Sequence, residues 1–498
     1  MKSKRTLINT LSSLLLQLVS IISGFIIPRL LLQTFGSEVN GLISSLNQFL
    51  NYITLFEGGL NAVILASLYK PLSEKNNDKV NAIVSATNRF YKKISLIFVI
   101  YTIVLGIIYP FVVKTSFGIE YIFTLTLILS VNLFSQYCFS ITWRTLLKAD
   151  KKVYLVSFVQ IVCIILNTIG VAILIKLFPN VHIVKLFSAI TYLLQPVIFN
   201  WYIKKNYNID KNVEPDKEAL AQRWDGLGIN IASFIHNNTD VVILTLFTDL
   251  KNVSIYSVYY LVTTGLKNLI TSISGGIIPT LGHAYVSGDK GKLNAIFDKY
   301  ELIIYMATFF LFVLGGILIT PFVLIYTKGI NDANYYQPVL GWIMIMAEFM
   351  FCIREPYVNM AYCANKFKEI SKYAYIEAII NIVLSIIFVI KFGIIGVAIA
   401  TFMAMTYRTI AHIFYLKDNI LHRSIGKSLK NMIIFLISAI IIVILSKLCF
   451  NIEKITILNW IIYAIKNTVL AIVVFAVALG IFYRKQISKV FKKVKEKN

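Results

Sequence analysis

The stretch ISLIFVIYTIVLGIIYPFVV, residues 94–113, contains no charged side chain. About 20 apolar residues in a helix cross the hydrocarbon core of a bilayer, so this stretch predicts a transmembrane helix. Thirteen further stretches have the same character, and the sequence therefore predicts an all-α polytopic membrane protein. The fourteen predicted spans are 7–32, 39–69, 94–113, 119–143, 153–177, 183–203, 224–247, 253–284, 300–326, 338–363, 372–390, 393–416, 431–450 and 459–483.

The positions of lysine and arginine predict the orientation of the spans. If the N-terminus is cytoplasmic, 35 of the 48 Lys+Arg residues fall in cytoplasmic tails and loops, and nine fall at external loops. Short cytoplasmic loops of membrane proteins are enriched in these residues. We therefore expect both termini on the cytoplasmic side. The N-terminal basic and apolar segment is interpreted as a retained first span, since it has no small-residue cleavage site.

Composition excludes several classes of protein and partner. The chain is 57% hydrophobic and 14% charged, which excludes a soluble globular protein. Its formal net charge of +24 lies in loops that face anionic membrane lipids, so no nucleic-acid partner is predicted. The five cysteines form no C-x-x-C pair, and we expect neither disulfides nor a metal site. No cofactor is predicted.

The loops leave little room for a catalytic domain. The predicted external loops are about ten residues or shorter, and the chain has no G-x-x-x-x-G-K-[ST] motif for nucleotide binding. The longer polar stretches, 70–93 and 204–223, are predicted to be cytoplasmic, and the second resembles a linker. These features argue against an enzyme.

The sequence repeats itself at a spacing of 213 residues. Lys79-Val80-Asn81-Ala82-Ile83 matches Lys292-Leu293-Asn294-Ala295-Ile296, and residues 201–206 (WYIKKN) match 414–419 (FYLKDN). Six spans separate the copies, so two six-helix units of the same orientation are predicted around a central cavity. The predicted domains are an N-terminal bundle 1–203, a linker 204–223, a C-terminal bundle 224–416, two extra helices in 417–483, and a basic tail 484–498.

Polar residues recur along one face of the second predicted span. Steps of three and four residues place these side chains on one side of a continuous helix. Span 253–284 carries a matching face. Such faces either line a hydrated groove or join helices to one another, and both interpretations remain open. The residues are Asn40, Ser44, Asn47, Asn51, Thr54, Gly58 and Asn61 in the second span, and Thr264, Lys267, Asn268, Thr271 and Ser274 in the eighth.

Charged residues inside the spans are the strongest candidates for a functional site. A charge at a helix centre costs about 2.5–3.5 kcal/mol, so each needs a function or a partner. Lys267 is the best candidate for meeting an anionic ligand. Arg29 and Asp240 lie at matched depths and are predicted to form an outer gate, unless Arg29 extends to the membrane surface. Glu57, Glu348 and Glu355 could carry a coupling H⁺ or Na⁺, or neutralise Lys267 and Arg354. Glu377 and Arg408 are predicted to form a structural pair.

The start of the chain resembles a known family. Pro28-Arg29-Leu30-Leu31, then FGSEVNGL at 35–42, then Phe56-Glu57-Gly58-Gly59-Leu60, are similar to the opening segment of the polysaccharide flippases. These proteins belong to the multidrug/oligosaccharidyl-lipid/polysaccharide exporter superfamily. The resemblance in organisation covers essentially the whole chain.

The resemblance implies a transporter in a bacterial plasma membrane that moves undecaprenyl-pyrophosphate-linked oligosaccharides from the inner to the outer leaflet by alternating access. It implies an ion gradient or membrane potential as driving force, and a polysaccharide polymerase as a partner machinery. Pyrophosphate would be bound by Lys267, Arg29 and Arg354, and sugar hydroxyls by the polar faces. The acids inside the spans outnumber the bases, which favours coupling through carboxylates.

Three alternatives are weighed against this prediction. A lipid II flippase or a cation-coupled drug antiporter would have the same organisation. A polytopic glycosyltransferase or polymerase would need a long external loop with catalytic residues, which this chain lacks. A membrane scaffold would leave the 213-residue repeat unexplained.

Overall fold

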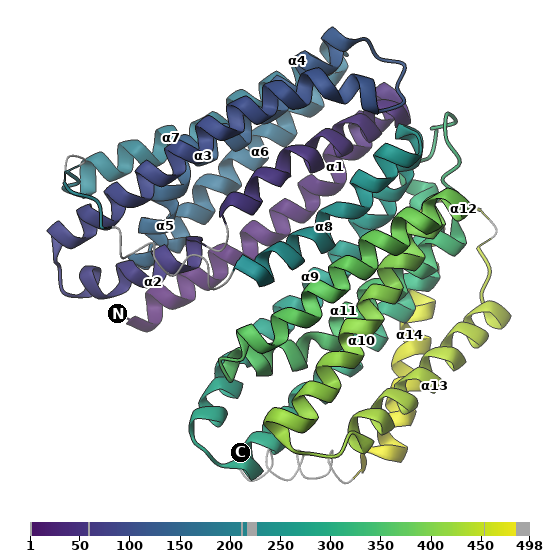
Figure 1. Ribbon diagram of the computed structural model, residues 1–498. Coiled ribbons are helices and arrows are strands. Elements are labelled where there is room, and N and C mark those ends of the chain that lie inside the picture. Colours follow the sequence, from purple (N-terminus) through teal and green to yellow (C-terminus); the bar gives the residue numbers. More distant parts are fainter. Residues whose placement is uncertain (1, 58–59, 211–212, 217–226, 453, 485–498) are drawn as a thin grey trace. The chain divides into compact units, whose positions relative to one another are not determined.

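The computed structural model describes residues 2–57, 60–210, 213–216, 227–452 and 454–484, and all regular structure there is helical (Figure 1). Wherever the structure describes the fourteen predicted spans, they are helical. This confirms the all-α polytopic fold. The α-helices are α1 Lys2–Asn51, α2 Leu60–Ser73, α3 Asn77–Val112, α4 Ile119–Ser135, α5 Ile141–Ala149, α6 Val153–Leu177, α7 Val181–Asn206, α8 Leu227–Phe247, α9 Leu250–Val286, α10 Lys290–Tyr326, α11 Pro338–Cys363, α12 Phe367–Leu416, α13 Gly426–Cys449 and α14 Ile457–Phe482.

Two of the longest helices combine predicted spans: α1 contains 7–32 and the start of 39–69, and α12 contains 372–390 and 393–416. The backbone breaks at Gly36 in α1 (φ 82°, ψ 179°) and at Gly393 in α12 (φ 56°, ψ −135°). In α12 the chain reverses at this glycine, because Asn381 Nδ2 donates to Thr401 Oγ1 at 2.9 Å across the two arms. Only glycine adopts such backbone angles without strain. The two glycines therefore form the turns of helical hairpins.

We predict that Gly393→Ala destabilises the protein, because a Cβ atom is strained at this φ and ψ by about 1–3 kcal/mol. Gly480→Ala is the matched control, since a Cβ there meets nothing within 4 Å and the residue lies inside α14. Thermal unfolding in detergent should show a lower melting temperature for Gly393→Ala and no decrease for Gly480→Ala. Equal melting temperatures for both variants would contradict a hairpin at Gly393.

Most of the predicted spans meet a membrane-crossing criterion in the structure. By length and apolar composition, nine helices in the described part of the chain could cross a membrane. Phe367–Leu421 holds two predicted spans, and Leu7–Glu57 holds the first span and part of the second. The predicted spans 224–247, 253–284 and 338–363 are outside this set. They correspond to α8, α9 and α11, and α9 and α11 carry the buried charges described below.

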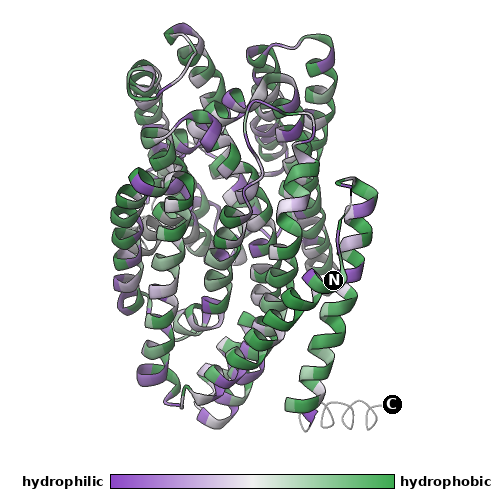
Figure 2. Ribbon diagram, turned by 90° about the vertical axis from the view of Figure 1, so that its right-hand side faces the viewer, coloured by the Kyte–Doolittle hydropathy of each residue, from purple (hydrophilic) through white to green (hydrophobic). Residues whose placement is uncertain are grey.

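The long helix α3 shows how the bundle faces lipid. One side buries Tyr91, Phe98 and Tyr109, whereas Leu96 and Phe111 are exposed, at 65% and 73%. Figure 2 shows hydrophobic residues along the helices and many hydrophilic residues at helix ends and turns. An apolar surface of this extent is unfavourable in water and suits the interior of a bilayer.

The predicted repeat is confirmed by identical local contacts. Asn76 caps α3 by accepting from the Lys79 backbone, and Asp289, 213 residues later, caps α10 by accepting from Lys292. Asn81 Nδ2 donates to the carbonyl of residue 208 at 3.4 Å, and Asn294 Nδ2 donates to that of residue 421 at 3.3 Å. Two copies of one helical unit therefore share their turns as well as their helices.

Packing divides the chain into two compact units, Met1–Ser257 with Gly329–Ala333, and Val258–Lys328 with Asn334–Asn498. The division falls within α9 and not at the predicted linker 204–223. Helix α8 and the start of α9 belong to the first unit because Thr245 donates to Ser45 at 2.8 Å and Asn40 donates to Ser254 at 2.8 Å. The predicted domain boundaries follow the repeat and remain a prediction. Of that prediction, residues 211–212, 217–226 and the tail 485–498 lie outside the described residues.

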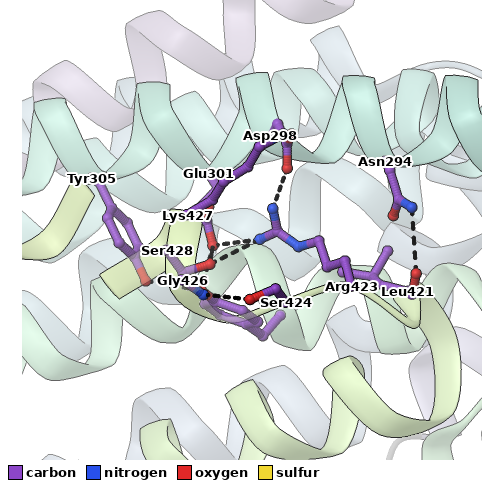
Figure 3. Close-up of polar contacts among 11 residues, drawn as sticks. Asn294, Asp298, Glu301, Tyr305, Leu421, Arg423, Ser424, Gly426, Lys427 and Ser428 are labelled. Carbon is purple, nitrogen blue, oxygen red and sulfur yellow. Dashed lines mark hydrogen bonds and ion pairs between the residues drawn. The ribbon is translucent and has the colours of Figure 1, made fainter. Parts of the chain in front are cut away.

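A cluster of ion pairs joins the second unit's repeat to α13 (Figure 3). Arg423 Nη2 donates to Glu301 Oε1 of α10 at 2.8 Å, and its Nη1 bonds Asp298. Ser428 Oγ donates to the same Glu301 oxygen at 2.6 Å, and Lys427 pairs with Asp298 at 2.8 Å. These contacts fix the loop that leads out of the repeat, so the two extra helices are anchored on α10.

The predicted continuous polar face of the second span is interrupted. Helix α1 ends at Asn51, and a 3₁₀ helix follows over Tyr52–Glu57. A 3₁₀ turn takes about three residues and not 3.6, so the periodicity assumed for one face fails there. Gly58 lies outside the described residues. The expectation of one uninterrupted helical face from Asn40 to Asn61 was therefore wrong.

Candidate functional site

The buried charges of the second unit are paired. Lys267 of α9 donates to Glu348 Oε1 of α11 at 3.0 Å, and both side chains are more than nine-tenths buried. The ammonium also lies 5.1 Å from the centre of the Phe351 ring. Glu348 Oε2 has no hydrogen-bond partner among the residues that the structure describes. Lys267 is therefore held as an ion pair, and the second carboxylate oxygen leaves an unfilled acceptor beside it.

A second buried cluster joins α11 to both arms of α12. Glu377 accepts from Arg354 Nη1 at 3.2 Å and from Arg408 Nη1 at 2.5 Å, and all three side chains are almost fully buried. The predicted Glu377–Arg408 pair is confirmed. Glu377 neutralises Arg354. The alternative prediction, that Glu348 or Glu355 neutralises Arg354, was therefore wrong.

Glu355 lies in a polar cluster of α9, α10 and α11. Its Oε2 accepts from Ser274 Oγ at 3.2 Å and from Asn359 Nδ2 at 3.1 Å. Asn359 also donates to the hydroxyl of Tyr300 at 2.9 Å. Glu355 is therefore held by neutral hydrogen-bond donors, and it forms no salt bridge within the described part of the chain.

In the first unit, a cavity of about 330 Å³ lies between α2, α4 and α5 and the short helices beside them. Glu57 lies on its wall and accepts from the hydroxyls of Tyr91 and Tyr137, each at 3.4 Å, and from Asn61. Thr145 Oγ1 donates to Asn61 Oδ1 at 3.1 Å. The residues lining the cavity are Thr54, Glu57, Asn61, Leu65, Leu133, Gln136, Tyr137, Ile141, Arg144, Thr145 and Lys148.

Two cations of this cavity were missed by the sequence analysis. Arg144 and Lys148 were assigned to a cytoplasmic loop, because the predicted span ends at residue 143. In the structure a π-helix at Gln136–Ser140 leads into α5, which carries both cations into the cavity wall. Their spacing of four residues, on one face of a short helix, was the available signal. Interruptions of this kind are frequent at functional sites.

The other predicted site residues are placed separately. Asp240 Oδ2 accepts from the Tyr256 hydroxyl at 2.6 Å, and the predicted gate between Asp240 and Arg29 stays a prediction. Asn47 is exposed, and the neighbouring polar residues of both faces are half-buried: Asn51, Thr54, Thr264, Asn268 and Thr271. Thr271 donates to the Asn268 carbonyl within its own helix. The hydroxyl oxygen of Thr264 is buried and has no hydrogen-bond partner among the described residues.

The second unit also holds an apolar groove of about 510 Å³ between α10, α11, α12 and α13. Phe309, Phe312, Phe349 and Leu436 are among the side chains that line it, and Lys447 is the charged one. A groove of this composition fits a hydrocarbon chain and offers nothing to sugar hydroxyls.

Comparison with solved structures shows which transporters have this fold. The lipid II flippase MurJ, in an inward closed conformation, superposes with a TM-score of 0.74 at 18% identity, over 96% of this chain and 100% of that chain. An inward-facing multidrug resistance MATE family transporter of the MOP superfamily gives 0.65 at 12% identity, over 81% and 94%. A eukaryotic MATE transporter gives 0.54 at 11% identity, over 84% and 98%.

No protein-family model matches the sequence, and no curated protein matches it. At these identities the likeness shows the fold alone. The chain has the fold that these three transporters share. The polysaccharide flippase subtype implied by the opening residues goes beyond this finding.

Proposed function

We propose that this protein is a flippase that moves polyprenyl-pyrophosphate-linked oligosaccharides from the inner to the outer leaflet of a bacterial plasma membrane, for the export of a surface polysaccharide. The observation that carries the proposal is the fold shared with a lipid II flippase over 96% of this chain. The matches to the two MATE transporters cover 81% and 84% of this chain. The difference is about the size of the segment after residue 416, which holds α13 and α14.

The chemistry of the interior supports an amphipathic and anionic substrate. An apolar groove in the second unit suits a polyprenyl tail, and the half-buried amides and hydroxyls of α1 and α9 suit sugar hydroxyls. Lys267 and Arg29 remain the proposed in-span cations for pyrophosphate. Arg354 is a further candidate. Lys267 must exchange Glu348, and Arg354 must exchange Glu377, for the pyrophosphate.

Carboxylates are proposed to couple transport to an H⁺ or Na⁺ gradient. Glu355 and Glu57 are held by neutral donors, and one oxygen of Glu348 is unfilled. Moving one charge across 100 mV supplies about 2.3 kcal/mol, which is enough to bias an alternating-access cycle. We further propose cytoplasmic termini, and delivery of the product to polysaccharide polymerase machinery outside the membrane.

A lipid II flippase is the second candidate, favoured by the same structural likeness. Substrate selectivity separates the two. In vesicles containing the purified protein, we expect an undecaprenyl-pyrophosphate-linked oligosaccharide to change leaflet faster than lipid II, and a cationic drug not to accumulate. Faster movement of lipid II would assign the second function, and drug accumulation would assign a drug antiporter.

A further inference from the structure

The cavity of the first unit has the side chains of an anion site. Arg144 and Lys148 lie four residues apart on α5, so both cations are on the same face of one helix turn. Like charges at this spacing destabilise a helix unless an anion lies between them. Glu57 is the one acid among the lining residues, and it is already bonded by Asn61, Tyr91 and Tyr137. The cavity therefore has an excess of one positive charge.

The guanidinium group of Arg144 has hydrogen-bond donors left for a ligand. Arg144 Nη1 contacts Gln136 Oε1 at 3.3 Å, which is a long bond that leaves most of the guanidinium fork unused. Thr54 also lines the wall, but its hydroxyl already donates to the Asn51 carbonyl at 2.8 Å. The donors left for a ligand are those of Arg144 and Lys148, and an arginine fork beside a lysine binds phosphate oxygens in proteins.

We propose that this cavity is a binding site for a phosphate-bearing head group, with Arg144 and Lys148 as its ligands. The inference rests on the proposed function, for which it supplies the site that first takes up the pyrophosphate of the lipid carrier. Lys148 is next to the last residue of α5, and in the predicted orientation the turn that follows it faces the cytoplasm. A lipid head group in the inner leaflet lies at this depth.

The size of the cavity limits what it binds. Small-molecule sites in proteins have volumes of about 300–1,000 Å³, and the cavity, at about 330 Å³, is at the lower end of this range. It suits a pyrophosphate with part of its first sugar and excludes a whole oligosaccharide. Glu57 stands on the same wall and repels an entering anion, so its charge should oppose binding.

The test measures binding to the purified full-length protein in lipid nanodiscs by native mass spectrometry. Three probes separate the sources of the phosphate group: undecaprenyl pyrophosphate, inorganic pyrophosphate and phosphatidylglycerol. We expect undecaprenyl pyrophosphate to bind most tightly, because the lipid chain holds its head group at the cavity. Tighter binding of inorganic pyrophosphate would assign a soluble ligand, and tighter binding of phosphatidylglycerol a structural lipid; either result would overturn a carrier-lipid site.

Variants identify the cavity as the site. Arg144→Gln with Lys148→Gln is expected to weaken undecaprenyl pyrophosphate binding about tenfold or more, since each charge-assisted bond lost is a large part of such affinity. Lys70→Gln with Lys93→Gln removes the same charge from exposed positions of α2 and α3 and should leave binding unchanged. Glu57→Gln should tighten binding several-fold, which a misfolded protein would not do.

The outcomes distinguish this inference from the proposed function. If Arg144→Gln with Lys148→Gln binds undecaprenyl pyrophosphate as tightly as the wild type, the cavity is not the site. Weaker binding by Glu57→Gln would also overturn it, as would a wild type that binds none of the three probes. If the wild type binds the lipid at this site but does not move it between leaflets, the proposed flippase function is wrong and the proposed binding site still holds.

Discussion

Replacing Glu377 by glutamine is expected to prevent the protein from accumulating in the membrane. Glu377 is 1% exposed and is bonded by the guanidinium groups of both Arg354 and Arg408. Without its charge, two buried cations face each other with no anion between them. Removing one partner of a buried ion pair costs about 3–5 kcal/mol, and here one acid serves two bases. This is a large share of the stability of a typical folded domain.

Glu369→Gln is the matched control for this prediction. Glu369 is on the same helix, and its pair with Lys366 at 2.9 Å is exposed on both sides. An exposed pair contributes little, so this variant should accumulate and unfold as the wild type does. The measurement is the amount of protein in isolated membranes and its melting temperature in detergent. Normal accumulation of Glu377→Gln would show that the cluster is not required for folding.

Neutralising Lys267 and Glu348 together is expected to restore folding and to leave transport slowed about tenfold or more. Either single variant, Lys267→Gln or Glu348→Gln, strands a buried charge and should lower stability by about 3–5 kcal/mol. The double variant removes both charges, and Glu348→Gln also keeps the shape of that side chain. Its stability should therefore return toward that of the wild type.

The double variant separates two roles of Lys267. If the lysine only neutralises Glu348, transport should recover together with stability, because no buried charge remains. If its ammonium exchanges Glu348 for the anionic substrate during the cycle, transport stays low in a stably folded protein. We predict the second result. Melting temperature and transbilayer movement of the oligosaccharide lipid, measured on one preparation, decide between them.

Much of the fold could be predicted from periodicity and charge. The limits of 153–177 and 338–363 are those of α6 and α11, since each is bounded by polar turns. The repeat at 213 residues predicted shared turns, and the caps Asn76 and Asp289 confirm them. Long apolar segments determine these features locally, so no tertiary information was needed.

The partners of the buried charges required the packing of distant helices. Arg354 and Glu377 are 23 residues apart on different helices, and only the hairpin at Gly393 brings Arg408 to the same carboxylate. Arg144 and Lys148 were taken for loop residues, because hydropathy does not show that a π-helix continues into α5. The 3₁₀ helix at Tyr52–Glu57 likewise depends on tertiary packing. It interrupts the polar face that the sequence predicted as continuous.

The rate at which a fluorescent undecaprenyl-pyrophosphate-linked oligosaccharide changes leaflet in vesicles tests the account most directly. The probe is placed in one leaflet and followed by its accessibility to a membrane-impermeant quencher. We predict that the probe moves at well above its rate in protein-free vesicles and faster than lipid II. We also predict that Lys267→Gln with Glu348→Gln slows this movement. A rate equal to that of protein-free vesicles, with folded protein present in both orientations and an ion gradient applied, would contradict the account.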